Sequence, residues 1–147
     1  TDQLIRGGLE VATPLRDRGV DLIAYADLSQ EVGGFVSRPI QMKVASNRVF
    51  SLDRKYERIA DLLIAFVWHI TAPEQTRVYA LSYADAFQVA DEVGWTTTAS
   101  WARGSYATTK PSRAIEQQLD RFRMTPARWF DAIVTTPLSV PRQTQSR

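Results

Sequence analysis

The sequence predicts an α/β fold, with a mixed central β-sheet flanked by helices and with extra helices towards the C-terminus. Three observations predict this fold. Residues 9–45 contain segments in which apolar and polar side chains alternate, as they do in strands. Residues 62–68 are apolar on both faces, which is typical of a strand buried within a sheet. After residue 83 the apolar side chains recur at helical spacing.

We predict one domain over residues 1–136, because a chain of 147 residues suits a single core. Residues 137–147 are rich in proline and polar residues, so we predict that they form a loose tail. Hydrophobic residues make up 44% and charged residues 23%, as in ordinary folded proteins. The absence of cysteine excludes disulfides, thiolate zinc sites and a cysteine nucleophile, so we expect a reducing, cytoplasmic location. The most apolar stretch, residues 62–70, is too short to cross a bilayer, which predicts no membrane role.

The first predicted elements are a helix end and a hairpin. Residues 1–6 have the character of a last helical turn, which Gly7 and Gly8 terminate because glycine readily adopts the left-handed conformation. Residues 9–13 and 20–25 alternate apolar and polar side chains and are separated by a short turn. We therefore predict two antiparallel strands.

A third strand is predicted over residues 35–45, with Gln41 and Lys43 on one face. Residues 51–61 are predicted to form a helix, because Ser51 can cap its free amides and Asp53 suits the positive end of its dipole. The apolar stripe of this helix would comprise Leu52, Tyr56, Ile59 and Ala60.

The apolar run over residues 62–68 is expected to be a central strand with helices on both sides. Residues 77–81 are predicted to form another strand, and residues 83–93 a helix that Gly94 terminates. The side chains of this helix that are predicted to face inward are those of Ala86, Phe87 and Ala90.

Residues 95–109 have no clear period and are predicted to form a loop with room for one short strand. Two helices then close the domain. Ser112 is placed to cap the first, and Thr125, followed by Pro126, is placed to cap the second. The side chains predicted to face inward are those of Ile115, Leu119, Phe122, Trp129, Phe130 and Ile133.

The feature that bears on function is an aspartate in the second predicted strand and a Gln-x-Lys pair in the third. Asp21 lies in Gly-Val-Asp-Leu-Ile-Ala, and Gln41 and Lys43 lie in Ile-Gln-Met-Lys. Side chains two positions apart share one face of a strand, about 6.5 Å from each other. If the two strands are neighbours, Asp21 joins Gln41 and Lys43 on that face.

These residue types suit the hydrolysis of a phosphodiester. Hard divalent cations prefer oxygen ligands, so the carboxylate of Asp21 and the amide oxygen of Gln41 could bind Mg²⁺ or Mn²⁺. Lys43 could position or activate the attacking water, or stabilise the charge that grows in the transition state. Asp21, Gln41 and Lys43 are therefore candidate catalytic residues, and Asp21 and Gln41 are candidate metal ligands.

The two segments around these residues resemble the motif of the PD-(D/E)XK nuclease superfamily, which includes restriction enzymes, archaeal Holliday-junction resolvases and repair nucleases. The resemblance covers about residues 1–68. Asp21 matches the aspartate of the motif, Gln41 its Glu/Asp position and Lys43 its lysine. It implies a restriction-endonuclease-like core and an endonuclease that uses Mg²⁺ or Mn²⁺ to hydrolyse phosphodiester bonds in DNA. A homodimer is a further expectation, because many similar nucleases dimerise to cut two strands.

The chain departs from the family pattern at two points. The family usually has Glu or Asp where this chain has Gln41, although glutamine variants occur among similar nucleases. A neutral amide binds Mg²⁺ less strongly than a carboxylate, because it lacks the charge. The family often takes a further glutamate from its first helix, whereas the nearest acidic candidate in this chain is Glu10, in the first predicted strand.

Basic residues could contact a nucleic-acid backbone. The formal net charge of +2 does not by itself establish such a partner, but arginine and lysine recur around residues 38–55 and 103–128. Residues 95–110 mix basic side chains with aromatic ones that could stack on bases or, alternatively, seal the core. The candidates for nucleic-acid contacts are Arg38, Arg48, Lys55, Arg103, Lys110 and Arg113, joined by Arg16 and Arg18.

Two other classes of function remain open. A domain with the same fold could bind nucleic acid without cutting it, because Gln41 weakens the metal site or because the acidic residue of the first helix is lacking. A protein-interaction domain is expected instead if the basic residues are scattered over all faces. His69 lies at the end of an apolar strand, where a structural role is favoured over that of a catalytic base.

Overall fold

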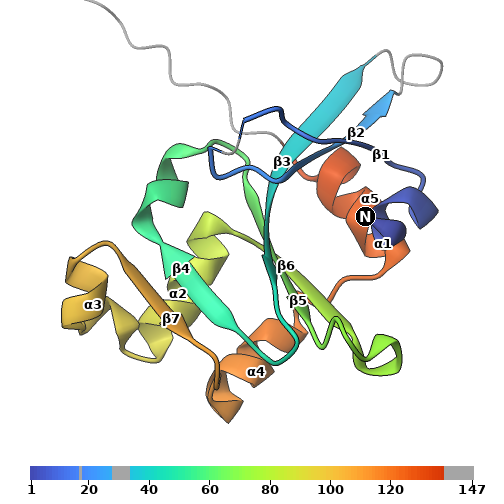
Figure 1. Cartoon of the computed structure of the whole chain (residues 1–147). Coiled ribbons are helices and arrows are strands. Elements are labelled where there is room, and N and C mark those ends of the chain that lie inside the picture. Colours follow the sequence, from blue (N-terminus) through green and yellow to red (C-terminus); the bar gives the residue numbers. More distant parts are fainter. Residues whose placement is uncertain (17, 28–33, 138–147) are drawn as a thin grey trace, which may run out of the picture.

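The computed structural model describes residues 1–16, 18–27 and 34–137. It contains two sheets, and helices lie on both sides of the larger one (Figure 1). The larger sheet has five strands in the order β1-β2-β3-β5-β6, and the smaller one pairs β4 with β7. This is the mixed, helix-flanked α/β arrangement that the sequence predicts. The tail predicted over residues 137–147 lies outside the described residues, except for Pro137.

The main sheet is mixed: one pair of neighbouring strands is parallel, and the other pairs are antiparallel. Its strands are β1 (Glu10–Ala12), β2 (Leu22–Asp27), β3 (Phe35–Val44), β5 (Leu63–Trp68) and β6 (Arg77–Ser82). β1, β2 and β3 pair antiparallel in sequence order, β5 is parallel to β3, and β6 is antiparallel to β5. β5 is buried along nearly its whole length, as its unbroken apolar sequence predicts.

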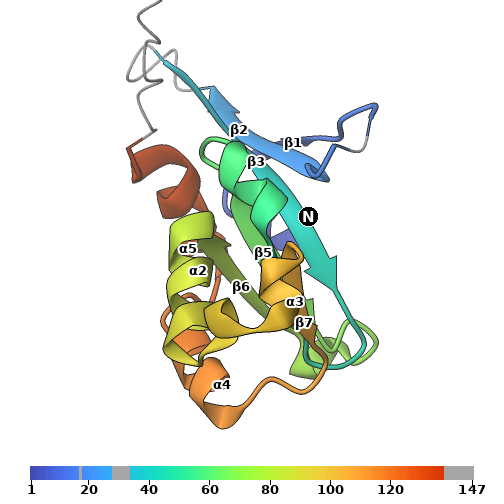
Figure 2. The ribbon, with the colours of Figure 1, turned by 90° about the vertical axis from the view of Figure 1, so that its left-hand side faces the viewer.

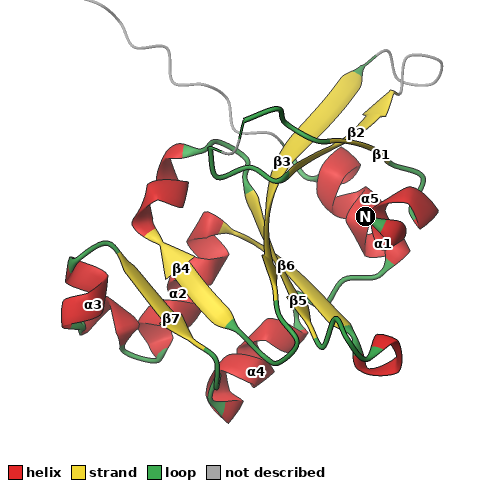
Figure 3. Cartoon of the chain, viewed as in Figure 1, coloured by secondary structure: helices red, strands yellow, loops and turns green. Residues whose placement is uncertain are grey.

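Helices cover both faces of the main sheet (Figures 2 and 3). One face carries α1 (Asp2–Arg6), α5 (Pro126–Phe130) and the π-helical turn η4 (Asp131–Thr135). The other carries α2 (Tyr83–Glu92), α3 (Ala99–Ala102), α4 (Arg113–Asp120) and the small sheet. The hydroxyls of Ser112 and Thr125 accept hydrogen bonds from the backbone N–H groups of Ile115 and Arg128, which confirms both predicted caps. Across the ranges described, no helix is long and apolar enough to span a membrane.

The prediction of a helix over residues 51–61 is wrong. Phe50–Asp53 form β4, which pairs antiparallel with β7 (Ser105–Thr108), and only a 3₁₀ helix, η1 (Arg54–Arg58), follows. Asp53, rather than Ser51, caps η1, because its side chain accepts a hydrogen bond from the backbone N–H of Lys55. Burial alternates along β4 with the period of a strand. Its partner strand comes much later in the chain, beyond the reach of a local pattern.

Residues 95–109 contain more regular structure than the predicted loop. A 3₁₀ turn, η3 (Trp95–Thr97), is followed by α3 and then by β7, the one short strand for which the loop had room. Trp95 and Trp101 are each 7% exposed and belong to the core, so these aromatic side chains seal the core. The prediction that Phe87 faces inward is wrong, because its side chain lies at the surface and is 38% exposed.

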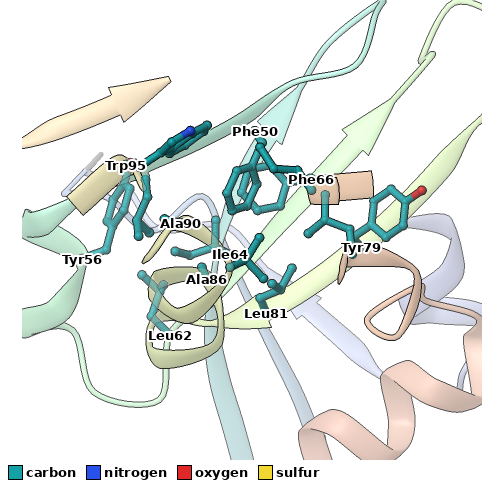
Figure 4. Packing of buried hydrophobic residues seen from close by; sticks show 14 of the residues in the cluster. Phe50, Tyr56, Leu62, Ile64, Phe66, Tyr79, Leu81, Ala86, Ala90 and Trp95 are labelled. Carbon is teal, nitrogen blue, oxygen red and sulfur yellow. The ribbon is translucent and has the colours of Figure 1, made fainter. Parts of the chain in front are cut away.

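The larger core lies between the main sheet and the layer formed by α2, α4 and the small sheet (Figure 4). Aromatic rings dominate it. The rings of Trp68 and Tyr79 pack edge to face with their centres 4.8 Å apart, and the ring centres of Phe50 and Phe66 are 5.0 Å apart. Such pairs contribute stabilisation beyond the burial of their area. A second core on the opposite face includes Leu4, Trp129 and Ile133.

Burial raises the pKa of the Tyr79 phenol, although a hydrogen bond with Arg77 opposes the shift. A phenol with a raised folded-state pKa contributes its full stability below the unfolded pKa of about 10, and this contribution is lost as the pH rises further. We expect the free energy of unfolding to fall above that pH, and to fall less steeply in a Tyr79→Phe variant. Urea unfolding across a pH series measures both slopes.

Burial also raises the pKa of Tyr83, so part of the alkaline slope should persist in the Tyr79→Phe variant. Identical slopes for the variant and the wild type would contradict the assignment to Tyr79. A Tyr79→Phe/Tyr83→Phe double variant should flatten the profile further.

Candidate functional site

The antiparallel pairing of β2 and β3 brings Asp21 against Gln41. The register pairs Leu22 with Ile40, and the backbone N–H of Asp21 donates a 2.8 Å hydrogen bond to the carbonyl of Ile40. The condition on which the meeting of Asp21 and Gln41 depends, that these two strands are neighbours, is therefore met. Asp21 itself directly precedes β2 rather than lying inside it.

The carboxylate of Asp21 accepts hydrogen bonds from two donors of β3. Its Oδ2 accepts from Nε2 of Gln41 at 2.5 Å and from the backbone N–H of Met42 at 2.6 Å. Gln41 is only 8% exposed, and its Nε2 also lies 3.2 Å from the carbonyl oxygen of Met42. Hydrogen bonds to a charged acceptor are short and strong, so Asp21 and Gln41 are fixed as a pair.

Lys43 lies on the same face of β3 as Gln41, and its ammonium group is directed at Tyr56 in η1. Nζ of Lys43 donates a 2.9 Å hydrogen bond to the Tyr56 hydroxyl and lies 5.1 Å from the centre of the ring. Tyr56 is 2% exposed and packs in the larger core, where Figure 4 labels it. The core therefore fixes the position of the Lys43 ammonium. The sequence pattern places Tyr56 only in an apolar stripe, and no local signal points to this contact.

Gly19 allows Tyr56 to come close to the segment that carries Asp21. The φ of Gly19 is +88°, in the left-handed region, and a β-carbon at this position would lie 3.2 Å from Cε1 of the Tyr56 ring. A side chain here would strain the backbone and press against the ring. The Tyr56 ring therefore packs directly against the segment that precedes β2.

Asp21 and Gln41 would offer a hard divalent cation at most two side-chain ligands, so such an ion would retain much of its water. Asp21 offers its carboxylate, and Oε1 of Gln41 would join it after a half-turn of the amide, which exchanges nitrogen and oxygen. Mg²⁺ commonly uses one or two carboxylates together with water and substrate phosphates. Within the residues that the structure describes, no group of three or more His, Cys, Asp or Glu side chains could hold a metal ion. A cation at Asp21 would therefore depend on bound substrate for some of its ligands.

Glu10 does not join this site. The register of β1 pairs Glu10 with Tyr25, four residues along β2 from Asp21. Four residues of strand span about 13 Å, beyond the reach of one shared cation. The side chain of Glu10 is exposed at the edge of the sheet, so it is not placed to act as a further acidic ligand beside Asp21.

The prediction that Arg38 contacts nucleic acid is wrong, because the structure places this residue inside the fold. It is 4% exposed, and its guanidinium donates hydrogen bonds to the backbone carbonyls of Thr136 and Pro137. Asp61 lies 3.8 Å from its Nη1, and its buried Nε has no hydrogen-bond partner among the described residues. These contacts tie the C-terminal segment to β3, which is a structural role.

The other basic candidates lie at the surface. Arg48 forms an ion pair with Glu116 of α4. Lys55 and Arg103 line one cavity, between η1 and the connection from α3 to β7. Lys110 and Arg113 are exposed near the start of α4, and so are Arg16 and Arg18 in the segment before Asp21.

The structure thus brings a carboxylate, an amide and an ammonium group to one region of β3, and a buried tyrosine fixes the ammonium. A carboxylate is a ligand type that divalent cations accept, and an ammonium group is a donor that suits a phosphate oxygen. The chain matches no family model, and no significant match was found among the curated proteins or the solved structures.

Proposed function

We propose that this chain is a metal-dependent endonuclease that hydrolyses phosphodiester bonds in DNA. The observation that carries the proposal is the contact between Asp21 and Gln41 across the paired β2 and β3, with Lys43 on the same face of β3. These are the three positions at which the sequence resembles the PD-(D/E)XK motif. Groups that act on one phosphate must converge in space, and the contact between Asp21 and Gln41 supports the proposal in this respect.

The order of the elements supports a restriction-endonuclease-like core. α1 is followed by three antiparallel strands, and the chain then returns to β5, which lies parallel to β3 and beside it. One feature departs from the predicted order, because the crossover carries β4 and η1 instead of a helix. The long helix on that face of the sheet is α2, which follows β6.

Each side chain of the site has a role in this proposal. Bound Mg²⁺ or Mn²⁺ would polarise the phosphodiester and lower the pKa of an attacking water. Asp21 would hold the ion through its carboxylate and Gln41 through Oε1. Lys43 would orient the water or neutralise the charge that grows on the phosphate oxygens. Tyr56 would keep the Lys43 ammonium in place and is therefore a positioning residue.

The proposal is tested with an Asp21→Asn variant. Asn keeps the shape of Asp21 but removes the negative charge, so we expect metal-dependent cleavage of supercoiled plasmid DNA to fall about a hundredfold or more. The matched control is Arg6→Ala, which removes a side chain that is 69% exposed on α1, a helix of the other face. Wild-type cleavage by the Asp21→Asn variant would reject the proposed metal site.

A second candidate is a nucleic-acid-binding module with the same fold that does not cut. It is favoured by the orientation of Gln41, whose amide nitrogen rather than oxygen faces Asp21. For this module, calorimetric titration with Mn²⁺ would give no heat, and the melting temperature would not rise with the metal. DNA binding would persist and would weaken with salt.

A further inference from the structure

A cavity of about 490 Å³ lies between η1 and the connection from α3 to β7, and basic side chains dominate its lining. Four cations and two carboxylates border it, which gives a formal charge of +2. They are Arg54, Lys55, Arg58 and Arg103, with Asp53 and Glu57. The pairing of β4 with β7 brings the two sides of the cavity together, and the backbone N–H of Arg54 donates a 2.8 Å hydrogen bond to the carbonyl of Gly104.

The carboxylates do not neutralise the arginines of this cavity. Asp53 caps η1 and lies 3.5 Å from Nζ of Lys55. Among the residues that the structure describes, no ion pair at 4.0 Å or less involves Arg54, Arg58 or Arg103. A guanidinium presents a planar fork of donors that matches phosphate oxygens. The cavity therefore suits an anion with several acceptor oxygens.

Tyr56 connects this cavity to the candidate active site. The centre of its ring lies 5.1 Å from Nζ of Lys43 and also 5.1 Å from Nζ of Lys55. One cation of the cavity and the candidate catalytic cation therefore share a single aromatic side chain. In Figure 2, η1 and α3, which both border the cavity, lie side by side in front of the main sheet.

We infer that this cavity binds a backbone phosphate of the DNA strand, next to the phosphodiester that meets Lys43. The inference rests on the proposed function, because it places the substrate on one side of that site. A polyanion with regularly spaced phosphates can offer one phosphate to Lys43 and another to the cavity. Contacts of this kind position a strand without reading its sequence, so the cavity contributes affinity and register rather than base preference.

The test measures binding separately from cleavage. Anisotropy of a fluorescently labelled DNA duplex, in EDTA and over a series of NaCl concentrations, is compared for the wild type and the Arg58→Ala/Arg103→Ala variant. We expect the double variant to bind about tenfold more weakly at low salt. The slope of log K against log [NaCl] should become shallower by about 0.9 for each phosphate that the variant no longer neutralises.

Two controls separate the cavity from general charge and from folding. Arg6→Ala removes an exposed arginine from α1 and should keep the affinity and slope of the wild type. Arg58→Lys/Arg103→Lys keeps both charges and should retain most of the binding, and thermal melting checks the fold of each variant. Unchanged affinity and slope in the alanine variant, or an equal loss in Arg6→Ala, would overturn the inference.

Failure of the proposed function gives a different result. Binding that depends on Arg58 and Arg103, without cleavage by the wild type in Mg²⁺ or Mn²⁺, supports the cavity and rejects the nuclease. If cleavage requires Asp21 but DNA binding does not depend on Arg58 and Arg103, the result supports the nuclease and rejects phosphate binding in the cavity.

Discussion

Replacing Lys43 with Ala is expected to reduce metal-dependent DNA cleavage by about 10²–10³-fold, the usual effect of removing one group that stabilises transition-state charge. The Lys43 ammonium is held 2.9 Å from the Tyr56 hydroxyl, and Tyr56 is fixed in the core. Such a fixed cation does not need to reorganise during the reaction. Single-turnover cleavage of a labelled duplex at saturating Mn²⁺ measures the loss, and anisotropy in EDTA checks that the variant still binds DNA.

A control for Lys43→Ala is needed because this substitution leaves the Tyr56 hydroxyl without its hydrogen-bond partner. The buried Tyr56 hydroxyl loses its hydrogen bond, which costs about 1–3 kcal/mol of stability if no other group replaces it. A Lys43→Ala/Tyr56→Phe variant removes the orphaned hydroxyl, and it should be as inactive as Lys43→Ala while melting at a higher temperature. Arg6→Ala, a change at an exposed arginine of α1, should cleave as the wild type does. Wild-type cleavage by Lys43→Ala would reject its catalytic role.

A Gln41→Glu variant is expected to respond to Mg²⁺ more strongly than the wild type. Without metal, the new carboxylate faces the Oδ2 of Asp21, which the Gln41 amide now contacts at 2.5 Å, and the two negative charges repel. With metal, two carboxylates share one cation and the repulsion becomes attraction. At a metal concentration of about 100 times Kd, binding adds about 2.7 kcal/mol to stability.

Differential scanning fluorimetry with and without Mg²⁺ measures this response. The expected order of melting temperature without metal is wild type above Gln41→Glu, and Mg²⁺ should narrow or reverse that difference. Gln41→Met keeps the length of the side chain without an oxygen ligand, so its melting temperature should be insensitive to Mg²⁺ at this site. Equal Mg²⁺ responses in Gln41→Glu and Gln41→Met would contradict a metal site between residues 21 and 41.

Local patterns predicted much of the main sheet because its strands carry their signals within a few residues. The unbroken apolar run of β5 and the alternation in β3 lie within single elements. The caps at Ser112 and Thr125 depend on side chains that bond to amides three residues ahead. For this reason the strands that carry Asp21 and Gln41 could be located from the sequence, whereas their pairing was only a condition that the structure then met.

Other features depend on interactions between distant segments. β4 resembles the start of a helix in sequence, and it becomes a strand because β7 pairs with it. Arg38 lies in a basic stretch of the sequence, but it is buried because its guanidinium donates hydrogen bonds to the backbone carbonyls of Thr136 and Pro137. The apolar stripe that contains Tyr56 gives no sign that the hydroxyl of this residue accepts a hydrogen bond from Lys43.

The sequence by itself determined a mixed, helix-flanked α/β sheet, the pairing of its first two strands and the identity of three polar residues on neighbouring strands. Only the tertiary structure decided that Tyr56 holds Lys43, that Arg38 is buried, and that η1 and the connection from α3 to β7 border a basic cavity. The physical reason is range. Strand alternation and helix caps act over a few residues, whereas these interactions join segments that are distant in the sequence and meet only in the folded chain.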